Sequence, residues 1–162
     1  MADELVIREL EPRDEERAVE IAVLAWEPVF VSFRELMGDS IFEAERGDWR
    51  ADKAEQIRRG IANEHARFCV AEIDGVVAGF VSFHTGASGV GEIGNNAVHP
   101  DFQNRGIATR LYQHALAEMK AAGMRAAKVQ TGLDRSHAPA RRAYEKAGFD
   151  RAVPSVTYYR QL

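Results

Sequence analysis

A short loop around Gly106 holds the residues of this chain that are best suited to bind a charged ligand. An apolar, strand-like run ends at the turn His99-Pro100, and an amphipathic helix begins just after the glycine. In such a loop several backbone N–H groups point at one spot, and the helix N-terminus adds its positive dipole end. Gly106 and the nearly as small Ala108 let a ligand approach the backbone, while Arg105 and Arg110 bring positive charge. These features predict an anion site that suits a phosphate or pyrophosphate.

A glycine between a strand and a helix is weak evidence by itself, because many such turns carry glycine for geometric reasons. One alternative is a phosphate-binding module for nucleotides. The segment, however, lacks the Gly-Lys-Ser/Thr ending of an ATP-binding loop, and no second glycine precedes Gly106 at the spacing of dinucleotide-binding folds. A second run of residues further along the chain favours a different interpretation.

Together, the two runs resemble the landmarks of the GCN5-related N-acetyltransferase (GNAT) family. The first run fits the family signature Gln/Arg-x-x-Gly-x-Gly/Ala through Gln103, Gly106 and Ala108. The second resembles the signature Asn-x-x-Ala-x-x-x-Tyr-Glu-Lys-x-Gly-Phe, with matches at Ala140, Tyr144, Glu145, Lys146, Gly148 and Phe149. Their order and their separation by about one helix and one strand are also typical of the family. The resemblance is sharp over residues 91–150 and topological over residues 67–90.

This resemblance implies transfer of an acetyl group from acetyl-CoA to a primary amine, without a metal ion. It also implies a bulge in the strand before the glycine loop, where Gly94 would help the backbone bend. Amides of the bulge would polarise the thioester carbonyl as negative charge develops on its oxygen, and amides of the loop would hold the pyrophosphate. The residues expected to contact the cofactor are Asn96, Ala97, Val98, Gln103, Asn104, Arg105, Gly106, Ile107, Ala108, Thr109, Arg110, His137, Ala140 and Tyr144.

Two side chains are candidates for proton transfer. Tyr144 matches the family position, and a phenol with a pKa of ~10 is a suitable donor to the leaving thiolate. The alternative is that its ring only packs under the cofactor. Glu92 is the candidate base for the amine, with a solvated surface charge or a chain of waters as alternatives. In a regular strand Glu92 would share a face with Gly94 and Asn96.

His137 stands where the family usually has asparagine. Its ring can keep a contact to the pantetheine arm or only mark the edge of a helix start. Aromatic residues are concentrated in the predicted first helices, which wall the acceptor site in this family. They either shape the amine pocket or pack in the core, and core packing is the more frequent role; these residues are Trp26, Phe30, Phe33 and Trp49.

An α/β fold is required to bring these groups together. We expect a single-domain acyl-CoA N-acyltransferase fold over residues 1–162, with a mixed, mostly antiparallel twisted sheet and helices on both faces. The dipeptide Asp74-Gly75 predicts a hairpin turn. The predicted order is a strand at 5–8, helices between 11 and 63, the hairpin over 67–83, a strand at 91–98, a helix at 106–122, a strand at 126–131, a helix at 138–147 and a closing strand at 153–161.

Composition limits the other possibilities. Of the 162 residues 46% are hydrophobic, and the net charge is −4, which argues against a nucleic-acid binder that relies on bulk charge. No apolar run has membrane-spanning length and the N-terminus has no signal pattern, so we expect a cytoplasmic protein without a membrane partner. Cys69 is the only cysteine, so neither an intrachain disulfide nor a cysteine metal cluster is possible.

The sequence therefore predicts an acetyl-CoA-dependent N-acetyltransferase that acts on a small-molecule or peptide amine. The alternative is a non-catalytic acyl-CoA-binding or sensing domain with the same fold, and the intact Tyr144 and Glu92 favour the enzyme. Longer acyl groups remain open, because the acyl pocket cannot be seen in a sequence. The predicted closing strand carries apolar side chains and is a candidate interface for a homodimer.

Overall fold

The computed structural model describes residues 4–162 and contains five strands and five helices. The strands are β1 (Leu5–Glu9), β2 (Arg67–Ile73), β3 (Val76–His84), β4 (Val90–Val98) and β5 (Ala126–Val129). The helices are α1 (Glu15–Met37), α2 (Asp39–Arg46), α3 (Trp49–Ile61), α4 (Ile107–Ala121) and α5 (Ala138–Lys146). Short 3-10 turns lie at Pro12–Asp14, Pro100–Phe102 and Arg135–His137.

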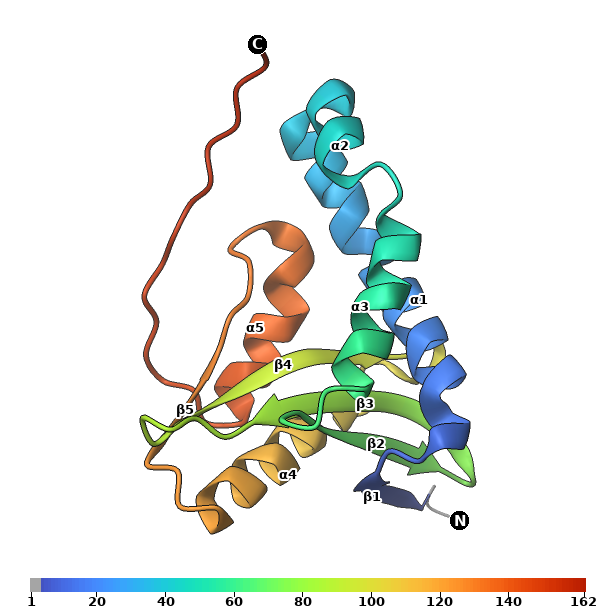
Figure 1. Cartoon of the computed structure of the whole chain (residues 1–162), viewed down its shortest axis with the longest axis vertical. Coiled ribbons are helices and arrows are strands. Elements are labelled where there is room, and N and C mark those ends of the chain that lie inside the picture. Colours follow the sequence, from blue (N-terminus) through green and yellow to red (C-terminus); the bar gives the residue numbers. More distant parts are fainter. Residues whose placement is uncertain (1–3) are drawn as a thin grey trace.

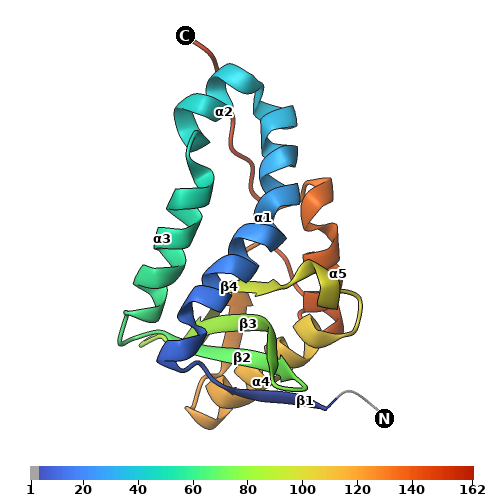
Figure 2. The same ribbon diagram turned by 90° about the vertical axis from the view of Figure 1, so that its right-hand side faces the viewer.

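The strands form one open sheet in the order β1-β2-β3-β4-β5 (Figure 1). Strands β1 to β4 are antiparallel to their neighbours, whereas β5 runs parallel to β4. Helix α4 covers one face, and α1 and α3 cover the other (Figures 1 and 2). Strand β3 is buried over nearly its whole length, as its almost continuous apolar sequence requires between two helical layers. The predicted mixed, mostly antiparallel sheet with helices on both faces is confirmed.

Three apolar clusters hold the layers together. The first lies between α4 and the sheet and includes Leu111 and Met119 from the predicted apolar stripe of α4. The second lies between α1, α3 and the sheet and includes Ile21 and Ile57. The third joins the end of α1 to α2 and the start of α3, and its buried residues are Phe30, Phe42 and Trp49. Core packing is therefore confirmed for two of the four aromatic residues in question, Phe30 and Trp49.

The predicted hairpin turn between β2 and β3 is confirmed. Asp74 and Gly75 have φ angles of 49° and 82°. A two-residue turn with positive φ at both positions matches the right-handed twist of the flanking strands, and Asp-Gly is one of the few dipeptides that adopt it readily.

Strand β4 contains the bulge that the family resemblance implied. Val81 of β3 pairs with Asn96, while Phe83 pairs with Ile93, so β4 has one residue more than β3 between these pairs. Gly94 and Asn95 together oppose Ser82. A Cβ on Gly94 would lie 2.7 Å from the Ser82 hydroxyl, which explains why the close approach of the two strands needs glycine here.

The bulge reverses which face of the sheet the later residues of β4 occupy. Ile93 packs in the cluster on the α4 face, whereas Ala97 packs in the cluster on the α1 face, although the two are four residues apart. In a regular strand they would share a face. The expectation that Glu92 and Asn96 lie on one face is therefore wrong, because the additional residue shifts the alternation between them.

Strands β4 and β5 separate beyond the bulge. They pair only from Val90 opposite Ala126 to Ile93 opposite Val129. From Gly94 onward, β4 is hydrogen-bonded to β3 on one side and has no strand partner on the other among the described residues. This divergence opens a space between β4 and α5, next to the start of α4.

The predicted closing strand over residues 153–161 is wrong. Residues 147–162 contain neither helix nor strand, and Figure 1 shows the C-terminal segment rising away from the sheet. Val153, Val156 and Tyr158 are 96%, 70% and 89% exposed. Their β-branched and aromatic side chains favour an extended backbone, but a strand also needs a neighbour for its hydrogen bonds, and this segment has none among residues 4–162.

Candidate active site

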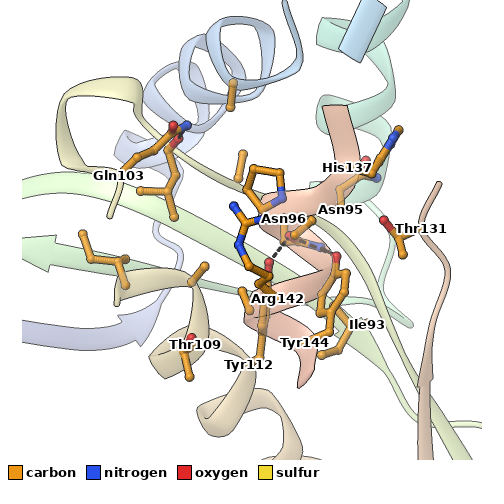
Figure 3. A pocket seen from close by; sticks show the side chains of 18 of the residues that line it. Ile93, Asn95, Asn96, Gln103, Thr109, Tyr112, Thr131, His137, Arg142 and Tyr144 are labelled. Atoms are coloured by element: carbon orange, nitrogen blue, oxygen red, sulfur yellow. Dashed lines mark hydrogen bonds between the residues drawn. The ribbon is translucent and has the colours of Figure 1, made fainter. Parts of the chain in front are cut away.

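A cavity of about 630 Å³ lies where β4 and β5 diverge. Its walls come from β4, the loop after Val98, the first turn of α4, the helix α5 and the middle of α1 (Figure 3). The sequence-predicted site residues that line it are Glu92, Asn96, Ala97, Val98, Gln103, Asn104, Gly106, Ile107, Ala108, Thr109, His137, Ala140 and Tyr144. Arg105 and Arg110 are not among its lining residues. The fold thus brings nearly the whole predicted set to one space, while the role of each residue stays a prediction.

The glycine loop has the backbone geometry of an anion site. Gly106 is left-handed, with a φ of 75°, and precedes the first residue of α4. No side chain caps this helix end, so its first amides have no side-chain acceptor. A Cβ at Gly106 would meet no atom within 4 Å, so the space beside the loop backbone is open. Gln103 fixes the loop by donating to the Val98 carbonyl over 3.1 Å.

Two buried tyrosines and the partly buried Asn96 converge on the floor of the cavity. The Asn96 side-chain amide donates to the Tyr144 hydroxyl over 3.1 Å, and its carbonyl oxygen accepts from the Tyr112 hydroxyl over 2.7 Å (Figure 3). The ring centroids of Tyr112 and Tyr144 lie 4.7 Å apart. Burial raises the pKa of Tyr144 and outweighs the lowering by its hydrogen bonds to Asn96 and Tyr112, so the phenol is protonated at neutral pH. This is the state that a proton donor needs.

Sequence reasoning missed Tyr112. The residue lies on the buried face of α4 next to the apolar stripe, where a tyrosine could be taken for an ordinary core residue. The signal that could have found it is its hydroxyl, because a buried phenol requires a hydrogen-bond partner. Burial also raises the pKa of Tyr112, so both phenols are neutral around the Asn96 amide.

Glu92 lines the cavity but is engaged by a cation. Its carboxylate lies 3.0 Å from the Lys128 ammonium and 3.8 Å from His84 Nε2. Lys128 occupies the position on β5 that pairs with Glu92 in the sheet. Because of the bulge, Glu92 faces the opposite side of β4 from Asn96 and Tyr144.

Lys53 is a buried cation that α3 places beside the cavity. Its ammonium donates to Asn95 Oδ1 over 3.1 Å and to Gln56 Oε1 over 2.9 Å. It also lies 3.5 Å from the centroid of the Trp26 ring, which itself lines the cavity. Burial lowers the pKa of Lys53 to about 8. The lysine therefore ties the bulge residue Asn95 to α3, while Trp26 lines the cavity and also packs against the third apolar cluster.

His137 and Asp134 form a hydrogen-bonded pair where α5 begins. His137 Nδ1 lies 2.5 Å from Asp134 Oδ1, and the imidazole is buried. The other oxygen, Asp134 Oδ2, accepts from the Ser136 amide over 3.1 Å, from the Ser136 hydroxyl and from the Ser32 hydroxyl of α1 over 3.0 Å. Burial alone would raise the pKa of Asp134, but these hydrogen bonds outweigh it and lower the pKa to about 2. Nothing in the sequence motifs indicated Asp134.

The charge of Asp134 should stabilise the fold in a pH-dependent way. The pKa of Asp134 falls from 3.8 to about 2 on folding. At pH values above 3.8 the carboxylate therefore contributes about 2 kcal/mol to the free energy of unfolding, and this contribution is lost as the pH falls toward 2. We expect Asp134→Asn to be less stable than the wild type at pH 7, with the difference shrinking between pH 5 and pH 2.5. Urea unfolding across this range measures it. A difference that does not change with pH would contradict this assignment.

Two further features of the described residues concern metals and membranes. Within residues 4–162 no three histidine, cysteine, aspartate or glutamate side chains are grouped so that they could hold a metal ion. None of the helices in this part of the chain is both long and apolar enough to cross a bilayer.

The acetyltransferase (GNAT) family model matches residues 30–149. The chain belongs to this family. A mycothiol acetyltransferase of Mycolicibacterium vanbaalenii is 29% identical over 93 residues, which make up 57% of this chain and 31% of that protein. The chain thus matches less than a third of that relative's length.

Solved structures show the same fold. The PaiA N-acetyltransferase of Thermoplasma acidophilum, determined in complex with coenzyme A, has a TM-score of 0.66 at 21% identity over 91% of this chain and 90% of that one. The ribosomal-protein-S18-alanine N-acetyltransferase of Escherichia coli has a TM-score of 0.67 at 19% identity over 93% and 80%. The predicted acyl-CoA N-acyltransferase fold is confirmed.

Proposed function

We propose that the protein is an acetyl-CoA-dependent N-acetyltransferase that acts on the primary amine of a small molecule or peptide. One observation carries the proposal. The cavity of about 630 Å³ joins the uncapped amides at the start of α4, the bulge of β4 and the Tyr144 hydroxyl in a single space. These are the three elements needed to bind a pyrophosphate, to stabilise an oxyanion and to protonate a leaving thiolate.

The proposed reaction uses these elements in order. The loop amides of residues 104–109 hold the pyrophosphate, and the pantetheine arm passes along β4 where β5 has diverged. The thioester carbonyl then lies beside residues 96–98, whose amides stabilise the developing oxyanion. The amine nitrogen attacks the carbonyl carbon, the C–N bond forms and the C–S bond breaks. Tyr144 gives its proton to the thiolate sulfur. Glu92 or a chain of waters is the base predicted from the sequence.

Calorimetric titration with acetyl-CoA, beside ATP and NAD, tests the cofactor half of this proposal. We expect selective binding of acetyl-CoA. The acceptor half is tested by thiol release in the presence of an aminoglycoside, a polyamine, an amino acid and a peptide with an N-terminal alanine. Binding with thiol release supports the enzyme. Binding without release would favour the acyl-CoA-binding or sensing domain, and absence of acetyl-CoA binding would overturn both.

We also propose that two copies of the chain associate through the C-terminal segment, in a protein that we expect in the cytoplasm. Val153, Val156 and Tyr158 are exposed apolar residues of this segment, and β5 is an edge strand whose outer side is free in the described chain. An unpaired edge and an unpaired extended segment are complementary, because each offers the backbone groups that the other lacks.

Truncation after Asp150 should therefore abolish dimer formation. We expect light scattering to give about twice 18.0 kDa for the full chain and a monomer mass below 18.0 kDa for the truncated one. Acetyl-CoA binding should persist in the truncated chain, because none of residues 151–162 lines the cavity. A monomeric full-length chain would contradict the proposed association.

A further inference from the structure

We infer that His137 is the base of the reaction, accepting the proton of the acceptor ammonium at Nε2 while Asp134 holds the ring. This inference rests on the proposed function and names a residue for its least defined step. It differs from the expectation that His137 only contacts the pantetheine arm in place of asparagine. Three observations carry it: the bond that fixes the tautomer, the open Nε2 atom, and the place of the ring on the acceptor side.

The bond to Asp134 fixes the tautomer of the imidazole. A carboxylate can only accept, so the 2.5 Å contact places the ring proton on Nδ1. The carboxylate is itself held by Ser136 and Ser32, and the low pKa of Asp134 keeps it ionised at neutral pH. The pair also packs closely on Gly132, where a Cβ would lie 2.5 Å from both Asp134 Oδ1 and His137 Nδ1. A ring that carries a single proton on Nδ1 presents an unprotonated Nε2.

The Nε2 atom is accessible within the cavity. Among the described residues that are not exposed, the only fully buried side-chain nitrogen or oxygen without a hydrogen-bond partner is Arg46 Nε. His137 Nε2 makes no hydrogen bond in the structure, so it cannot be fully buried. His137 lines the cavity (Figure 3), and we take this partly exposed lone pair as the one that faces a ligand there.

The ring lies on the α1 side of the cavity, which is where we place the acceptor. Trp26 and Phe33 of α1 pack against it with ring centroids 6.2 Å and 5.8 Å away. Behind these rings lie two cations, Lys53 on Trp26 and Arg46 on Phe33. The pyrophosphate loop is at the other end of the cavity.

The charges around the imidazole come from several elements. The carboxylate in direct contact is Asp134 from the loop before α5, and Arg141 of α5 donates to the backbone carbonyls of Gly132 and Asp134. The Ser32 hydroxyl of α1 donates to the same carboxylate. Glu92, the other candidate base, is paired with the Lys128 ammonium over 3.0 Å.

The proton balance of the step is complete. An acceptor ammonium loses two protons when it becomes an amide. The first passes to His137 Nε2 and frees the nitrogen lone pair for attack on the thioester carbon. The second leaves the nitrogen when the tetrahedral intermediate collapses, and it replaces the proton that Tyr144 gives to the sulfur. The imidazolium then returns its proton to solvent.

Nitrogen-15 NMR of histidine-labelled protein tests which ring nitrogen of His137 carries the proton, and it needs no acceptor. We expect the signal that disappears in His137→Asn to belong to a neutral ring protonated at Nδ1. A ring protonated at Nε2 would overturn the inference, because such a ring cannot accept a proton there.

Kinetics of thiol release, measured with an acceptor that gives turnover, test whether His137 acts as the base. Asparagine at 137 can still donate to Asp134 but has no atom at the place of Nε2. His137→Asn should lower kcat/KM about 10²-fold or more and remove the acidic limb of its pH profile, with the dissociation constant of acetyl-CoA changed less than twofold. Asp134→Asn should lower kcat/KM as well, because an amide can donate to Nδ1 and favour the other tautomer.

Control measurements separate the possible failures. His65→Asn removes an exposed histidine in the turn after α3 and should leave every parameter unchanged. If His137→Asn keeps kcat/KM and its pH profile while weakening acetyl-CoA, His137 binds the pantetheine arm and the inference is wrong. If the wild type binds acetyl-CoA but none of the tested acceptors leads to thiol release, the proposed function is wrong. The assignment of the base is then wrong as well.

Discussion

Replacing Tyr144 with phenylalanine should lower kcat by about 10²-fold and leave the affinity for acetyl-CoA nearly unchanged. The substitution removes only the hydroxyl that would protonate the leaving sulfur. The apolar contacts of the ring remain, including its packing against Tyr112. Asn96 also stays satisfied, because its amide still donates to the Gly94 carbonyl over 3.0 Å and its oxygen still accepts from Tyr112. Steady-state thiol release and calorimetry measure the two effects separately.

Tyr112→Phe is the matched control, since it removes the other phenol hydroxyl from the same cluster. This hydroxyl donates to Asn96 and faces no predicted reacting atom, so its loss should cost about 1 kcal/mol of stability and little turnover. Equal turnover in wild type and Tyr144→Phe would remove Tyr144 from the mechanism. A larger loss of turnover in Tyr112→Phe than in Tyr144→Phe would show that Tyr112, and not Tyr144, is the proton donor.

Gly106→Val should raise the dissociation constant of acetyl-CoA by at least about tenfold, or about 1.4 kcal/mol. The space beside Gly106 holds no protein atom within 4 Å, so the valine side chain would fill the volume that the proposed pyrophosphate needs. The substitution also strains the backbone, because Gly106 has a φ of 75°. This strain lowers stability by about 1–2 kcal/mol.

Gly123→Val separates the two effects of that substitution. Gly123 follows the other end of α4, has a φ of 85° and likewise has open space around it, so valine imposes a similar strain away from the cavity. We expect similar losses in melting temperature for the two variants and weaker acetyl-CoA binding only for Gly106→Val. Unchanged affinity in Gly106→Val would show that the pyrophosphate lies elsewhere.

Local sequence signals predicted the parts of the site that depend on the backbone. A glycine before a helix and a dipeptide such as Asp74-Gly75 act through steric preferences of one or two residues, so they are readable without knowledge of the fold. Tyr144 was predicted in another way, from its match to the family signature together with Glu145, Lys146, Gly148 and Phe149.

The parts that failed depend on partners far apart in the sequence. The side of β4 on which Glu92 lies is set by the pairing of β4 with β3, and the C-terminal segment lacks a strand partner that its composition alone could not reveal. Asp134 was missed because its hydrogen bond to Ser32 joins residues 102 positions apart. Such contacts exist only once the sheet has brought α1 next to α5.

The additional residue in β4 lets Ile93 and Asn96 lie on the same face of the sheet although they are three positions apart. Deleting Asn95 would restore simple alternation and leave Asn96 opposite Val81, on the face of Tyr112 and Tyr144. The predicted proton donor would keep its amide partner, while the bulge and the hydrogen bond from Lys53 to Asn95 would be lost. A one-residue deletion would thus separate the contribution of the bulge from that of the Asn96–Tyr144 pair.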